Sequence, residues 1–265
     1  MNRIQTILAD QTQMSKIKQG AYIVFLLFVV VVSFSASGKK SNKAVEDLIV
    51  RIEPLSNGHM LIDTSDVYDL VEGGFGSRLI GKRVGSIDEA RVERIITDFP
   101  FVKSAEVYIN AHEELHINII QRQPLLRVLA DNGLNYYMDV EGVRIPLSNH
   151  ITERLVVFTG NIPPHVPDFK EAGPALLQDV FAFGQLIHAD PFFNSLIEQV
   201  DVQGKEFVLI PKLGRQKIKF GGMDDAEGKL ERLKKFYQEV LGAEGYKKYK
   251  IIDVRFDKQV VCEKR

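Results

Sequence analysis

The sequence predicts an α+β protein with one transmembrane helix, a small strand-helix-helix-strand-strand domain and a larger β-rich domain. An uncharged apolar segment near the N-terminus predicts the transmembrane helix. Segments that alternate between apolar and polar residues predict the strands, and segments with a helical period lie between them. The expected parts are a tail over 1–19, a transmembrane helix over 20–38, a linker over 39–47, a first domain over 48–124 and a second domain over 125–265.

The composition is that of an ordinary globular protein. Of the 265 residues, 45% are hydrophobic and 26% are charged, and the 34 Lys and Arg residues nearly balance the 35 Asp and Glu residues. A nucleic-acid-binding domain needs a clustered positive excess, so this function class is not indicated. The single cysteine, Cys262, excludes an intramolecular disulfide, and stability must therefore come from burial.

The membrane segment is the longest apolar stretch of the chain. Residues 19–38 carry no charge, and residues 21–32 are apolar or aromatic throughout. Twenty residues span roughly 30 Å as a helix, which matches one hydrocarbon core. A cleaved signal peptide remains an alternative, because basic residues precede the apolar run and small residues follow it. Lysines flank both ends, so the long part after the span, rather than charge, places the N-terminus in the cytoplasm.

Two helices are expected in the first domain. Residues 63–66 (Asp-Thr-Ser-Asp) are typical of a helix start, and Gly73-Gly74 predicts its end. Ser86 and Glu89 have the spacing of a capping box, in which each side chain accepts a backbone N–H of the other. The second helix is therefore expected to open at Ser86.

The remaining elements of the first domain are a strand over 48–53 and a hairpin with strands over 105–109 and 115–119. His112-Glu-Glu-Leu-His116, in and after the turn, matches H-E-x-x-H, the zinc-peptidase signature that requires a helix. In an extended chain the two histidines lie about 13 Å apart, too far for one zinc ion. The alternating flanks therefore favour hairpin residues. An exported zinc metallopeptidase built on His112, Glu113 and His116 is the alternative hypothesis.

The second domain is expected to be rich in strands. Residues 136–139 and 142–145 predict a hairpin. Residues 227–241 have the apolar stripe of an amphipathic helix. The last strand is expected over 250–261, because Ile252, Val254 and Phe256 alternate with charged residues.

In their order along the chain, these segments resemble the FtsQ/DivIB family of bacterial cell-division proteins. The first domain is similar to that family's POTRA domain, and the second to its β domain. The HEELH hairpin and the proline-rich loop over 161–167 have no counterpart in the family pattern. The segments that carry the resemblance are Ile49–Glu53, Ser86–Val107, Ile119–Leu125, Tyr137–Val143, Leu213–Gly221, Lys229–Leu241 and Ile252–Asp257.

The resemblance implies a bitopic scaffold of the division complex, without catalytic activity, cofactor, metal or small-molecule substrate. It implies an inner-membrane location at the septum, with both folded domains in the periplasm. It also implies that FtsB- and FtsL-like partners bind to the final strand and to the helix before it. A C-terminal strand readily forms a sheet edge to which a partner strand can add. The matching positions are Asp253, Val254, Arg255, Phe256 and Asp257, with Leu233, Phe236 and Tyr237 on the helix.

Overall fold

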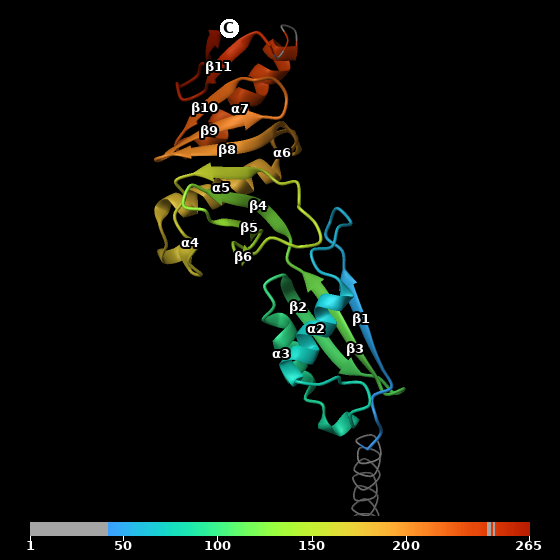
Figure 1. Cartoon of the computed structure of the whole chain (residues 1–265). Coiled ribbons are helices and arrows are strands. Elements are labelled where there is room, and N and C mark those ends of the chain that lie inside the picture. The colour runs from blue at the N-terminus through green and yellow to red at the C-terminus, as the bar shows by residue number, and fades with distance from the viewer. Residues whose placement is uncertain (1–41, 243–244, 246) are drawn as a thin grey trace, which may run out of the picture. The chain divides into compact units, whose positions relative to one another are not determined.

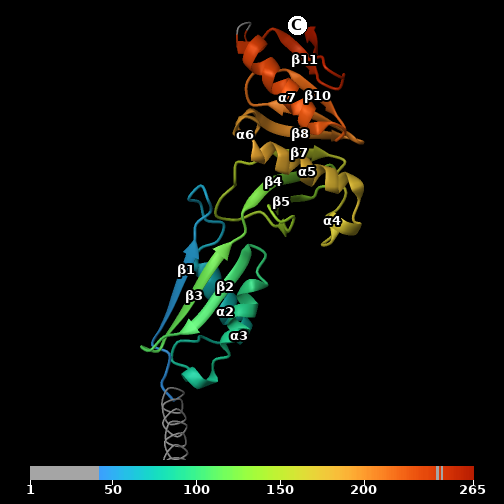
Figure 2. The same ribbon diagram turned by 180° about the vertical axis from the view of Figure 1, so that it is seen from behind.

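The computed structural model describes residues 42–242, 245 and 247–265 (Figures 1 and 2). Among these residues no helix has both the length and the apolar character needed to cross a bilayer. The tail expected over 1–19 and the transmembrane helix expected over 20–38 lie outside the described residues, as does the start of the linker expected over 39–47.

The described chain forms two compact units. The smaller sheet contributes residues to both of them. The first unit contains the described residues up to Arg51 with Tyr68–Ile96 and Glu106–Asn118, and the second contains Ile52–Val67, Thr97–Ala105 and Ile119–Arg265.

The smaller sheet has three strands in the order β1-β3-β2. In the first unit, helices α2 and α3 cover one face of this sheet (Figures 1 and 2). The apolar side chains of both layers, among them Val71, Val92 and Leu115, are buried. The predicted strand-helix-helix-strand-strand order is confirmed. The elements are β1 (Asp47–Glu53), α2 (Thr64–Phe75), the 3-10 turn η1 (Val84–Ser86), α3 (Glu89–Thr97), β2 (Val102–Ile109) and β3 (Glu114–Gln121).

Two predicted helix ends are wrong. Helix α3 is capped by Asp88, whose Oδ1 accepts the Arg91 N–H at 3.1 Å, whereas Ser86 belongs to η1 and donates to the Arg83 carbonyl. Ile87 is extended and separates the two elements, so the Ser86 capping box does not form. Helix α2 continues through Gly74 to Phe75. A Cβ at Gly74 would lie 2.7 Å from Ile95 Cδ1 of α3. That glycine permits close packing of α2 on α3 rather than ending the helix.

The second unit contains a nine-stranded sheet in the order β12-β11-β10-β9-β8-β7-β4-β5-β6 (Figure 1). Three neighbouring pairs are parallel, β4 with β7, β7 with β8 and β10 with β11, and the other pairs are antiparallel. The strands are β4 (Pro124–Ala130), β5 (Asn135–Asp139), β6 (Arg144–Ile145), β7 (Val157–Gly160), β8 (Ile197–Gln203), β9 (Glu206–Pro211), β10 (Lys217–Gly221), β11 (Tyr249–Asp253) and β12 (Val261–Lys264).

Helices make two of the three crossovers between parallel strands, and the β4–β7 connection passes through β5 and β6 instead. The β7–β8 connection contains α4 (Phe169–Ala172), α5 (Ala175–Ala189) and α6 (Pro191–Leu196), and the β10–β11 connection contains α7 (Ala226–Phe236) and the π-helical turn η2 (Tyr237–Leu241). Phe183 of α5 lies at the centre of the core. Its ring centroid is 5.0 Å from that of Phe207 and 4.6 Å from that of Phe220. This aromatic packing holds α5 against β9 and β10, next to the strands at the C-terminal edge.

Candidate partner-binding surface

The C-terminal strand differs from its prediction. The strand expected over 250–261 ends at Asp253, and the chain reverses before β12 pairs antiparallel with β11. Asp253 causes this end, because its Oδ1 accepts the Arg255 N–H at 3.1 Å in place of a strand partner. Lys258 then adopts a left-handed conformation, with φ of 55°. β11 therefore has a neighbour on both sides, and the expectation that it forms the sheet edge is wrong.

The edge strand at the C-terminal end of the sheet is β12, and β6 forms the opposite edge. Among the described strands β12 pairs with β11 alone, so one row of its backbone groups faces away from the sheet. Its side chains are mostly exposed, and Val261 is 46% exposed. Glu263 of this edge pairs with Lys250 of β11 at 3.2 Å. The strand is thus short, accessible and open along one side.

The predicted positions after β11 divide into buried and exposed ones. Asp253 and Val254 are buried, at 7% and 0% exposure. Arg255, Phe256 and Asp257 lie on the surface of the turn, and Phe256 is 44% exposed although it is a large apolar side chain. Only the last three can present their side chains to another protein.

The predicted helix positions are mostly part of the core. Leu233 of α7 is fully buried, and Tyr237 at the start of η2 is 4% exposed, with its hydroxyl accepting from Gln216 Nε2 at 2.9 Å. Phe236 is half-buried and packs edge-on against Tyr249 of β11, with a centroid distance of 5.7 Å. Phe236 thus supports β11, Leu233 and Tyr237 belong to the core, and the three do not form an exposed face.

A charged network fixes the turn that follows β11. Arg255 binds the Asp253 carboxylate through Nε at 3.0 Å and Nη2 at 2.8 Å, and its Nη1 lies 3.4 Å from Glu206 of β9. Burial raises the pKa of Asp253, but the hydrogen bonds from Arg255, together with the positive charges of Arg255 and Lys219, outweigh burial and hold that pKa below its usual value. From α7, Arg232 Nη2 donates to the Val254 carbonyl at 3.4 Å. The exposed Phe256 is therefore carried by an ordered turn.

The HEELH segment is a hairpin turn followed by a strand. Asn110 Oδ1 accepts the N–H groups of His112 and Glu114, at 2.8 and 3.1 Å, and Glu113 is left-handed with φ of 61°. His112 lies in the turn, and His116 lies in β3 with its ring stacked on Tyr108. The helix that a zinc peptidase requires is absent from this segment, so the peptidase alternative is not supported.

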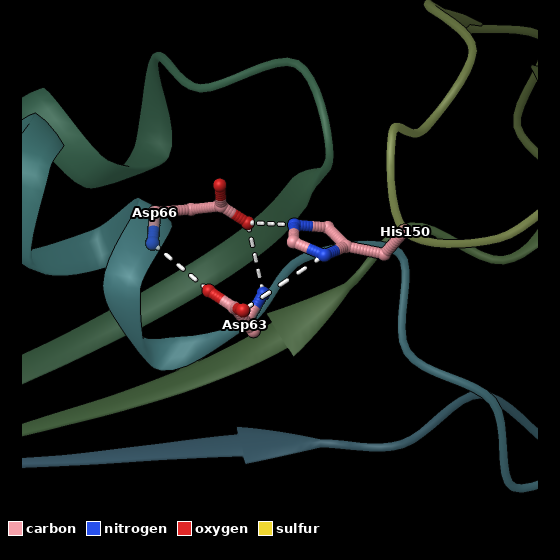
Figure 3. A group of neighbouring side chains, drawn as sticks. All are labelled: Asp63, Asp66 and His150. Carbon is pink, nitrogen blue, oxygen red and sulfur yellow. Dashed lines mark hydrogen bonds and ion pairs between the residues drawn. The ribbon is translucent and has the colours of Figure 1, made fainter.

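Another group of possible ligands lies at the start of α2 (Figure 3). Of the residues described, Asp63, Asp66 and His150 are the group of three whose candidate ligand atoms lie within 4.8 Å of one another. Asp63 Oδ1 accepts the N–H groups of Ser65 and Asp66, at 2.8 and 3.1 Å, while Asp66 Oδ2 accepts the Asp63 N–H at 2.9 Å. These bonds form a capping box. The Ser65 hydroxyl also donates to Asp63 Oδ1 at 2.6 Å, and this bond lowers the pKa of Asp63 most, with the N–H groups of Asp66 and Ser65 lowering it further.

His150 completes this cap from a distant part of the sequence. Its Nε2 lies 2.7 Å from Asp66 Oδ2, and its Nδ1 lies 3.8 Å from Asp63 Oδ2 (Figure 3). The carboxylates already accept helix N–H groups, and the positive end of a helix disfavours a cation. We therefore interpret the three residues as a helix cap joined to a loop rather than as a metal centre. The predicted cap at Asp63 is confirmed, whereas local spacing could not have identified His150.

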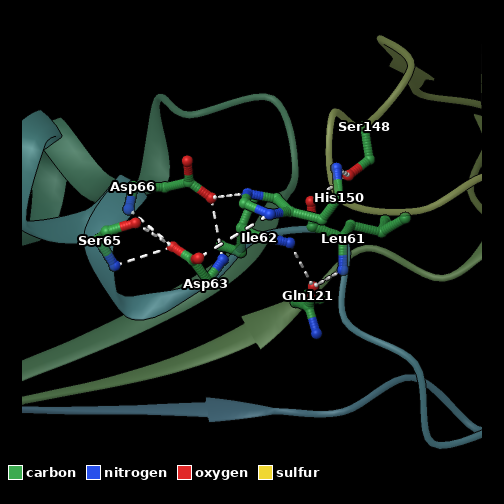
Figure 4. Close-up of polar contacts among 8 residues, drawn as sticks. All are labelled: Leu61, Ile62, Asp63, Ser65, Asp66, Gln121, Ser148 and His150. Carbon is green, nitrogen blue, oxygen red and sulfur yellow. Dashed lines mark hydrogen bonds and ion pairs between the residues drawn. The ribbon is translucent and has the colours of Figure 1, made fainter.

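Gln121 holds the neighbouring loop in place (Figure 4). Its Oε1 accepts the N–H groups of Leu61 and Ile62 at 2.7 and 3.3 Å, and its Nε2 donates to the Glu53 carbonyl at 2.7 Å. The Ser148 hydroxyl donates to the Leu61 carbonyl from the same segment that carries His150. The polar groups of the loop are thus satisfied by side chains, which gives the loop one defined conformation.

Comparison with known protein families identifies both domains. A family model described as FtsQ/DivIB, C-terminal related, matches residues 123–263, which is more than half of the chain. The chain belongs to the FtsQ/DivIB family. A POTRA-like domain model matches residues 46–120 of this FtsQ/DivIB protein. None of the curated proteins compared with it is similar enough to count as a match.

Family membership indicates the general role. FtsQ/DivIB proteins are membrane-anchored components of the division septum, and in general they are scaffolds rather than enzymes. The two matched domains of this FtsQ/DivIB protein therefore indicate a scaffold in cell division. The resemblance recognised in the sequence is confirmed.

Proposed function

We propose that this chain is a bitopic scaffold of the divisome that binds FtsB- and FtsL-like proteins through the C-terminal edge of its nine-stranded sheet. The proposed contact is β12 with the turn that carries Arg255, Phe256 and Asp257. It involves no catalysis, cofactor, nucleic acid or small-molecule substrate.

The proposed topology follows the sequence. A cytoplasmic tail over 1–19 and a retained membrane helix over 20–38 anchor the chain in the inner membrane. A linker over 39–47 leads to the POTRA-like domain over 48–124 and the β domain over 125–265, both in the periplasm at the septum. The anchor keeps the binding edge in the same compartment as the extracytoplasmic parts of its partners.

One observation carries the proposal, namely that β12 is a short strand with a single described neighbour. A partner segment that adds as a tenth strand would satisfy the outward backbone groups of β12. Alternate side chains would supply the selectivity, with Val261 and Phe256 as apolar contacts on an otherwise charged edge. Natural sheet edges carry charges to prevent indiscriminate pairing, and Glu263 and Lys264 serve that purpose here.

The buried positions act by support in this proposal. Leu233 and Tyr237 belong to the buried core, Val254 holds the turn after β11 in place, and these side chains do not reach the partner. Val254 illustrates the difference, because its N–H donates to the Lys219 carbonyl at 3.1 Å. A proline at Val254 would break the sheet itself, so loss of binding in that variant would not identify the contact surface.

The test is a pair of matched substitutions in the full chain. Val261→Glu places a carboxylate at the proposed interface, and Val166→Glu makes the same change at a loop position that is 40% exposed. We expect Val261→Glu to weaken binding of the purified FtsB- and FtsL-like partners about tenfold or more, since burying an unpaired charge costs more than ~1.4 kcal/mol. Val166→Glu should bind normally.

The readout is the dissociation constant, with circular dichroism to confirm that both variants fold. Phe256→Ala should also weaken binding, because it removes the largest exposed apolar side chain of the turn. Full-strength binding by both Val261→Glu and Phe256→Ala would refute the edge as the binding site.

A further inference from the structure

The loop between α2 and α3 has an unusual outward-facing residue. Leu79 is 2% exposed and fixes the loop to the first unit, whereas the next residue, Ile80, is 47% exposed. A single exposed isoleucine is ordinary on a protein surface. The charges around Ile80 and the position of the loop in the chain are what distinguish this one.

Within the loop over 76–86, every charged residue next to Ile80 is basic. Residues 76–86 contain Arg78, Lys82 and Arg83 and no acidic residue. Arg91 of helix α3 adds a fourth cation to this basic group. Its guanidinium lies 4.8 Å from the centroid of the Phe75 ring, and Lys82 Nζ lies 5.6 Å from the centroid of the same ring, so the two cations are close together. Ile80 and the half-buried Phe75 are therefore apolar groups within a basic surface.

Most of this charge is not neutralised within the protein. Arg78 lies 3.3 Å from Glu72, but in the described part of the chain no carboxylate is within ion-pair distance of Lys82, Arg83 or Arg91. A basic surface of this kind, with an apolar side chain at its centre, has the composition of an interfacial membrane contact.

The loop also lies beside the point where the described chain begins (Figures 1 and 2). The Val84 N–H donates to the Lys43 carbonyl and the Val45 N–H to the Lys82 carbonyl, both at 2.8 Å, and Ala44 forms a β-bridge with Arg83. The uncharged segment of the sequence ends at Gly38. Five further residues reach at most about 17 Å, so a retained span would hold this loop close to the bilayer surface.

We infer that the loop over 76–86 docks on the anionic phospholipid surface, with Ile80 in the headgroup region and Lys82, Arg83 and Arg91 against the phosphates. The inference rests on the proposed function in one respect, since it requires the membrane anchor. Docking would fix the orientation of the first unit on the bilayer.

The protein contains no tryptophan, so Ile80→Trp introduces a single reporter. The full-length variant is reconstituted in lipid nanodiscs made of zwitterionic lipid alone or with phosphatidylglycerol, each with and without brominated acyl chains. In the anionic discs we expect the emission to shift to shorter wavelength and to be quenched by the brominated lipid. Val166→Trp, in the second unit, controls for random collisions and should remain unquenched.

A second comparison tests the charges. Adding Lys82→Gln and Arg83→Gln to Ile80→Trp should lower the ratio of docked to free loop about 25-fold, because each cation near an anionic surface contributes about fivefold. Lys205→Gln with Lys217→Gln removes the same total charge from exposed positions elsewhere and should leave quenching unchanged.

The outcomes separate this inference from the scaffold function. Equal emission of Ile80→Trp in anionic and zwitterionic discs, or an equal effect of the two double substitutions, overturns the docking. A chain that does not remain in the discs refutes the anchor and with it the docking, while binding of the FtsB- and FtsL-like partners tests the scaffold function separately.

Discussion

Replacing Gln121 by methionine should destabilise the second unit without changing its core volume appreciably. Gln121 is 5% exposed and serves three backbone groups, the N–H groups of Leu61 and Ile62 and the Glu53 carbonyl (Figure 4). Methionine has a similar length but neither accepts nor donates comparably. The substitution therefore leaves buried polar groups without partners rather than creating a cavity.

The magnitude follows from the burial of those groups. Leu61 and Ile62 are each 1% exposed, so water cannot easily replace the lost bonds. An unsatisfied buried group costs about 1–3 kcal/mol, and relaxation of the loop limits the total to about 3 kcal/mol. With a urea dependence of about 2 kcal/mol per molar, the unfolding midpoint should fall by about 1.5 M.

The assay is urea unfolding of the full chain in detergent, followed by circular dichroism, with amide hydrogen exchange at Leu61 and Ile62 as the local readout. Gln123→Met is the matched control, because Gln123 serves one exposed group, the Ser56 N–H at 3.1 Å. The control should lower stability by no more than about 1 kcal/mol. If Gln121→Met unfolds at the same urea concentration as Gln123→Met, the clamp assigned to Gln121 does not stabilise the fold.

Two further predictions concern the β domain. Gly160→Ala should lower stability by at least about 2 kcal/mol in urea unfolding, because φ is +100° and a Cβ would meet the Val202 carbonyl oxygen. Gly133→Ala, where φ is +84° and the site is open, should cost only about 1 kcal/mol; equal losses would contradict the steric argument. Acid should also weaken the fold. The hydrogen bond from Lys234 lowers the pKa of Asp190, so its contribution is present above the unfolded pKa and is lost as pH falls through the folded pKa. Below about pH 4 the urea midpoint of Asp190→Asn should therefore depend less on pH than that of the parent protein; parallel curves would refute this.

Local periodicity was sufficient to predict most elements of the fold. The alternation around Val107 and Ile117 predicts the β2–β3 hairpin, and the stripe through Leu230 and Leu233 predicts α7, because both patterns are set by neighbouring residues. Strand β4 could not be predicted in this way. Its burial alternates from Leu126 to Ala130, but the exposed Leu129 is apolar too and Leu125 is also buried, so the period is not visible in the sequence.

The site depended on information that local patterns do not contain. Ile252, Val254 and Phe256 alternate as a longer strand would, but Asp253 ends the strand by binding Arg255. That competition is decided by side-chain hydrogen bonds, which periodicity does not reveal. The position of β12 at the edge and the pairing of His150 with Asp66, 84 residues apart, depend on the tertiary fold alone.

The strand order of the large sheet has a consequence for how the domain assembles during synthesis. β4, β5 and β6 form one end of the sheet, β7 returns to pair with β4, and each later strand from β8 to β12 then adds beside the strand that precedes it in the chain. The sheet can thus grow in one direction as the polypeptide emerges, with every intermediate offering its open side to the next segment. A partner strand joining β12 would continue the same growth by one step, with a different chain supplying the segment.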